Sequence, residues 1–124
     1  MIVNIHAAWI GFLCGCVAGI VSGMFFYGRD WLGGYSSWRR RMIRLGHIAF
    51  FGIGFLNLSF AFSSRALGLE SGLAAPSALL VLGAVTMPLV CYLSAWKPFF
   101  RHTFCVPALS VTVAVVLFLW RVLS

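Results

Sequence analysis

The sequence carries little charge, and acidic residues are almost absent from it. Only 9% of its 124 residues are charged, and just two of those are Asp or Glu. A typical soluble domain is about a quarter charged, so this composition excludes an ordinary soluble domain. The two acidic residues, Asp30 and Glu70, lie outside the long apolar runs. We therefore expect neither catalysis by paired carboxylates nor transport coupled to a carboxylate inside the membrane.

Motifs that would identify a reaction are also missing, and we predict no catalytic residues. There is no Gly-rich phosphate-binding loop, and the sequence offers no convincing Ser–His–acid set. All four cysteines fall inside apolar runs rather than in loops, which is typical of buried thiols that pack as small apolar groups. The first residues lack the basic cluster of a secretory signal, so we expect the first apolar run to be retained as a membrane span.

Apolar residues dominate what is present. They make up 62% of the chain, and the mean hydropathy is +1.02. An apolar stretch of about 20 residues matches the roughly 30 Å hydrocarbon core of a bilayer, and the sequence contains four stretches of about that length. We predict a single membrane domain over residues 1–124, an all-α integral membrane protein built as a four-transmembrane-helix bundle. The expected spans are about 5–27, 47–64, 76–96 and 103–122.

The net charge of +7 is concentrated between the spans. Seven of the nine basic residues lie in the connections 28–46 and 97–102. Positive charge favours the cytoplasmic side, so we expect both termini on the non-cytoplasmic side, in a bacterial inner membrane. The first connection is predicted to be a short basic interfacial segment that binds lipid headgroups or an acidic neighbour. Its anchoring residues are Arg39, Arg40, Arg41 and Arg44. This distribution indicates a bilayer rather than a nucleic acid as the partner.

Four glycines recur every fourth residue in the first span: Gly11, Gly15, Gly19 and Gly23. At 3.6 residues per turn they form a nearly straight stripe along a helix, with the spacing of a glycine zipper. Such small residues let another membrane helix approach closely. We predict that this stripe is the main packing surface, within the chain or toward another subunit. Asn57, inside the second span, is also predicted to hydrogen-bond to a neighbouring helix.

The histidines suggest an alternative, haem-binding function. His47 begins the second span and His102 precedes the fourth, so both would ligate one haem iron if those helices were neighbours. Residues 101–107 (RHTFCVP) resemble the start of the small b-type cytochrome helices of photosystem II, in which a histidine is also followed by a proline five residues on. This seven-residue resemblance implies haem b as the cofactor, with His102 as a ligand. The simpler interpretation is that both histidines are ordinary boundary residues.

A second hypothesis concerns soft metal ligands near the connection between the third and fourth spans. The residues are Met87, Cys91, His102 and Cys105. Thioether, thiolate and imidazole groups together suit Cu(I). Apolar packing explains the methionine and the cysteines equally well.

These observations favour a small multi-pass protein that acts as an accessory, structural or assembly subunit of a larger membrane complex, for example a respiratory one. Other membrane subunits are then its expected partners. A haem-binding or haem-handling protein and a small-solute pore or transporter are the alternatives.

Overall fold

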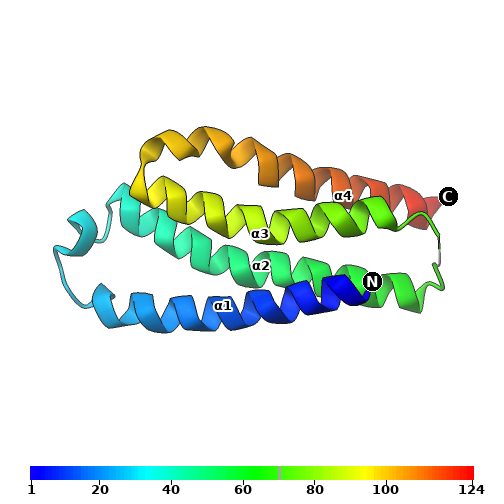
Figure 1. Cartoon of the computed structure of the whole chain (residues 1–124), viewed down its shortest axis with the longest axis horizontal. Helices are drawn as coiled ribbons and strands as arrows, with labels where there is room; N and C mark the ends of the chain where they lie inside the picture. Colours follow the sequence, from blue (N-terminus) through cyan, green and yellow to red (C-terminus); the bar gives the residue numbers. More distant parts are fainter. Residues whose placement is uncertain (70) are drawn as a thin grey trace.

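The computed structural model describes residues 1–69 and 71–124, so Glu70 lies outside the described residues. Four long α-helices run back and forth along the molecule (Figure 1). They are α1 (Ile2–Phe26), α2 (Trp38–Ala66), α3 (Ala74–Trp96) and α4 (Cys105–Leu123), with short 3₁₀ helices η1 (Trp31–Gly33) and η2 (Pro98–Phe104) in two of the connections. Each long helix, α4 together with η2, is long and apolar enough to cross a membrane. The predicted all-helical, multi-pass membrane fold is confirmed.

Each helix packs mainly on its neighbours in the chain. α1 lies against α2, α2 against α3, and α3 against α4, while α1 also makes a smaller contact with α3. Both termini lie at one end of the bundle, and the connections that contain η1 and η2 lie at the other (Figure 1). We call the latter the basic end, because seven of the nine basic residues are in or beside these two connections. The arrangement places α1 and α4 on the outside.

The basic segment is organised differently from the interfacial segment that we expected. Residues Arg39 to Arg44 belong to the first turns of α2 itself, which is one continuous helix of 29 residues. The Ser37 side chain caps this helix by accepting a hydrogen bond from the Arg40 backbone N–H at 3.3 Å. A helix of this length spans about 43 Å, more than the roughly 30 Å of hydrocarbon. The helix is therefore long enough to carry the arginines beyond an apolar layer without a break.

A buried polar network joins the first three helices. Asn4 of α1 donates from Nδ2 to Asn57 Oδ1 of α2 at 2.8 Å and to the Ser77 carbonyl of α3 at 3.2 Å. Ser77 Oγ donates back to Asn4 Oδ1, and Asn57 Nδ2 donates to the Leu80 carbonyl at 3.1 Å. Asn4 and Asn57 are completely buried. Because an unpaired amide in hydrocarbon is costly, these bonds favour one relative position of α1, α2 and α3.

Apolar packing joins α4 to the rest. Phe60 of α2, Leu80 of α3 and Ala114 of α4 meet in one buried cluster. Ser110 Oγ of α4 donates to the Leu79 carbonyl of α3 at 2.6 Å. α4 is thus attached along one face, chiefly to α3.

Candidate functional site

Three of the four stripe glycines lie against α2. An added Cβ would lie 3.3 Å from the Phe50 carbonyl oxygen at Gly11, 2.7 Å from the Phe51 ring at Gly15 and 2.6 Å from His47 Nε2 at Gly19. At Gly23 an added Cβ would meet no described atom within 4 Å. Most of the stripe therefore packs within the chain, where it accommodates aromatic side chains of α2.

The arginines divide between two roles. Arg39 and Arg41 are exposed, so they are available to headgroups. Arg44 donates to the Tyr35 carbonyl at 3.2 Å, with its guanidinium over the Tyr35 ring. Arg40 differs from the anchoring role that we predicted, because it is only 2% exposed. The reason is the connection that folds over it.

The buried Arg40 side chain holds the connection between α1 and α2 together. Its Nε donates to the Trp31 carbonyl at 2.5 Å, and its guanidinium also donates to the Gly28 carbonyl. The guanidinium carbon lies 5.7 Å from the Phe26 ring centre and 5.6 Å from that of Trp31. These contacts satisfy carbonyls of the connection and add cation–π attraction. Arg40 is therefore a structural residue of this connection.

The structure does not bring the two predicted haem ligands together. His47 points toward α1, since its Nε2 lies beside Gly19 and its ring lies edge-on to Phe51. His102 is exposed in η2, beside Phe99. α3 lies beside both α2 and α4. The alternative of a shared haem site depended on the second and fourth helices being neighbours at these histidines, and this arrangement does not place them so.

The predicted soft-metal residues are also dispersed. Cys91 is completely buried and faces α2, because its Cβ lies 3.1 Å from a Cβ built on Gly46. Cys105 is exposed and its thiol donates to the His102 carbonyl at 3.4 Å. The remaining residue, Met87, is half-buried on α3. Across residues 1–69 and 71–124, no three His, Cys, Asp or Glu side chains are grouped to hold a metal ion.

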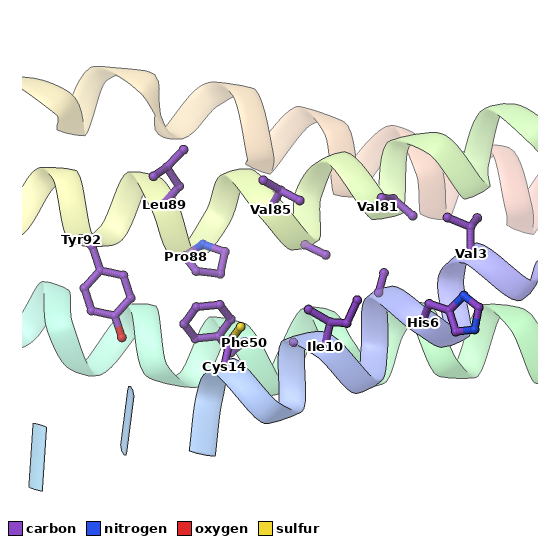
Figure 2. Close-up of a pocket in the computed structure, with 13 residues that line it drawn as sticks. Val3, His6, Ile10, Cys14, Phe50, Val81, Val85, Pro88, Leu89 and Tyr92 are labelled. Carbon is purple, nitrogen blue, oxygen red and sulfur yellow. The ribbon is translucent and has the colours of Figure 1, made fainter. Parts of the chain in front are cut away.

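An apolar cleft lies between α1 and α3, and we call it the α1–α3 cleft (Figure 2). Its volume is about 550 Å³. The lining includes His6, Ile10 and Cys14 of α1, Phe50 of α2, and Val85 and Tyr92 of α3. The cleft exists because the facing side chains at Ala7, Gly11 and Ala84 are too short to fill the space between the helices.

Sequence reasoning missed this cleft and two residues that shape the bundle. Asn4 is a lone polar residue at the start of an apolar run, and only its spatial proximity to Asn57 shows its role. Tyr92 carries a buried hydroxyl that has no hydrogen-bond partner within residues 1–69 and 71–124. For the α1–α3 cleft, the sequence did contain a signal. Small residues recur at Ala7, Gly11 and Cys14, spaced by four and three residues, on the side of α1 that lines the cleft.

Comparisons with known proteins add no identity to this geometry. Searches with protein-family models, with curated proteins and with solved structures found no match to the chain.

Proposed function

We propose that this chain is an accessory subunit of a larger membrane complex and acts by packing its outer helices against other membrane proteins. The supporting observation is the uneven burial of the four helices. Only 6% of the residues in the apolar window of α1 are buried, and 17% in that of α4, against 39% in α2 and in α3. The two outer helices therefore retain large unpartnered surfaces.

The outward face of α4 has a spacing suited to helix packing. Its exposed residues Val106, Leu109, Val113, Val116 and Trp120 follow one another at intervals of three and four. This spacing is that of helices that pack side by side over several turns. Valine has essentially one χ1 rotamer in a helix, so packing this face costs little side-chain entropy. The opposite face is already used, since Pro107, Ser110 and Ala114 are buried.

The distribution of charge supports a bacterial inner-membrane location with the basic end in the cytoplasm. Basic residues near membrane spans favour the cytoplasmic side, and seven of nine belong to this end. Both termini would then lie on the non-cytoplasmic side. A fusion of alkaline phosphatase to the C-terminus should be active and a fusion of green fluorescent protein should not. The reverse result would overturn this orientation.

The arrangement of the polar side chains favours the accessory role over haem binding and over a pore. His47 and His102 face different surroundings. The polar groups of Asn4, Asn57 and Ser77, which a water-filled path would use, are hydrogen-bonded between helices.

Crosslinking in native membranes tests the proposal. A photoreactive benzoylphenylalanine replaces Leu109 on the outward face of α4, and in a control it replaces Phe55, an exposed aromatic residue of α2. We expect Leu109 to crosslink to a different membrane protein that also co-purifies in stoichiometric amount, and Phe55 to give little product. Extraction of the chain alone, or crosslinks only between its own copies, would refute the accessory role.

A further inference from the structure

The α1–α3 cleft adjoins a second cavity nearer the basic end. This cavity has a volume of about 240 Å³ and is lined by Leu32, Arg39, Ile43, Tyr92, Ala95 and Trp96. Tyr92 lines both cavities, and Figure 2 shows it at one end of the α1–α3 cleft. Its ring fits there because α2 has no side chain at Gly46, where an added Cβ would lie 3.0 Å from Tyr92 Cε2.

Helical spacing shows that the two cavities follow one groove. On α2, Ile43 is four residues after Arg39, and Phe50 is seven after Ile43. On α3, Val85, Tyr92 and Trp96 are spaced by seven and four. Residues at these intervals share a helix face. The lining therefore changes from apolar to cationic along a single groove on the α1 side of α2 and α3.

The dimensions of the groove match one leaflet of a bilayer. Along α3, the apolar part from Val81 to Tyr92 rises about 16 Å, and half of the hydrocarbon core is about 15 Å. Trp96 is one further turn along, at the end where Arg39 lies. Tryptophan is typical of the boundary between hydrocarbon and headgroups. The cationic part of the groove is thus at the depth of lipid headgroups.

The chemistry of the two parts specifies an amphiphile with a negative head. An exposed arginine binds phosphate oxygens through paired N–H donors, whereas Arg40 beside it is occupied by carbonyls of the connection. We propose that the groove binds one anionic phospholipid, with its phosphate at Arg39 and one acyl chain in the α1–α3 cleft. The proposal does not depend on the accessory role, since it needs no other protein.

The size of the cleft favours a flexible acyl chain over a helix of another protein as the occupant. A helix segment 16 Å long and about 10 Å wide fills about 1,200 Å³. The cleft offers about 550 Å³. A single flexible chain enters such a space, whereas a folded helix would lie across its opening and fill it only in part.

Two matched pairs of variants test the two halves of the site. Arg39→Gln removes the cation in the groove, and Arg41→Gln removes an exposed cation about 200° around the same helix. Ala84→Phe fills the cleft, and Ala108→Phe adds the same bulk to an exposed position of α4. Each protein is reconstituted in nanodiscs of equal phosphatidylglycerol and phosphatidylcholine with identical acyl chains. After mild detergent release, native mass spectrometry measures the retained lipid.

We expect the unmodified chain to retain one phosphatidylglycerol in preference to phosphatidylcholine. Arg39→Gln should reduce this preference about fivefold, the factor for one basic residue near a lipid surface. Arg41→Gln should reduce it much less, because Arg41 lies outside the groove and meets only the surrounding headgroups. Ala84→Phe should lose the bound lipid, and Ala108→Phe should keep it.

Equal preferences in the two arginine variants would overturn the proposal, even if Ala84→Phe fails to fold. Retention of phosphatidylcholine as strongly as phosphatidylglycerol, or purification from native membranes with a neutral lipophile in place of phospholipid, would overturn it as well.

Discussion

The same substitution at two stripe glycines should change stability in opposite directions. Gly15→Ala and Gly23→Ala add one methyl group each, eight residues apart on one face of α1. At Gly15 the new Cβ would lie 2.7 Å from Phe51 Cε2 and 3.1 Å from Phe50 Cβ. At Gly23 it would meet no atom of the described chain within 4 Å.

The surroundings of Phe51 determine how much the first substitution costs. The Phe51 ring is stacked on Phe12 with centroids 6.0 Å apart and meets His47 edge-on at 5.4 Å, so it cannot swing away freely. Overpacking of this kind costs about 1–3 kcal/mol. Replacing glycine by alanine in an open helix position gains up to about 1 kcal/mol. We therefore expect the unfolding free energy of Gly15→Ala to be lower than that of Gly23→Ala by about 1–3 kcal/mol.

Steric trapping in bicelles measures these unfolding free energies in a lipid bilayer without denaturant. Leucine at the same two positions should widen the difference in unfolding free energy, because α2 leaves no room for a larger side chain at Gly15 but does not contact Gly23. Equal free-energy changes for the two alanine variants would refute the packing of the stripe against α2.

Three further predictions concern polar groups. In a double-mutant cycle, Asn4→Ala and Asn57→Ala should show a coupling energy of about 0.6 kcal/mol and no more than about 1.7 kcal/mol, the range of hydrogen bonds between membrane helices. Strictly additive effects in the same trapping assay would contradict the hydrogen bond between Asn4 and Asn57. Arg40→Gln should lower the unfolding free energy by about 2 kcal/mol, because it removes charged hydrogen bonds to the three carbonyls of Gly28, Arg29 and Trp31. Exposed Arg41→Gln should change it by no more than about 0.5 kcal/mol; similar unfolding free energies for the two variants would contradict the buried role of Arg40. Tyr92→Phe should raise the unfolding free energy by about 1 kcal/mol, because it removes a buried hydroxyl without a partner in the described chain; a loss of stability would show that the hydroxyl is hydrogen-bonded.

The sequence was most informative where a single physical property dominates. Runs of apolar residues long enough to cross hydrocarbon identify the four spans regardless of how the helices pack, because each span satisfies its own backbone hydrogen bonds. The clustering of basic residues in the connections 28–46 and 97–102 likewise identified the basic end. The sequence did not show that Arg39 to Arg44 are continuous with α2, because a separate interfacial helix and an extension of α2 have the same helical periodicity.

Side-chain roles were less predictable, because residues with the same chemistry and spacing occupy different surroundings. Arg40 and Arg41 are neighbours in the sequence, yet one is buried under the connection and the other is exposed. Gly15 and Gly23 share a stripe, yet only Gly15 faces an aromatic side chain of α2. His47 lies nine residues inside α2 and His102 lies in η2, and the order of the helices directs them to different surroundings.

The sequence by itself determined that the chain is all-helical, that it has four helices apolar enough to cross a membrane and where its positive charge lies. These features depend on local hydropathy and on the need of each span to form its own backbone hydrogen bonds. Only the tertiary structure decided that Asn4, Asn57 and Ser77 meet, that Arg40 is buried and that a groove runs from Arg39 into the α1–α3 cleft. In an apolar bundle many helix faces look alike, and the few buried polar contacts and close approaches at small residues select one arrangement among them.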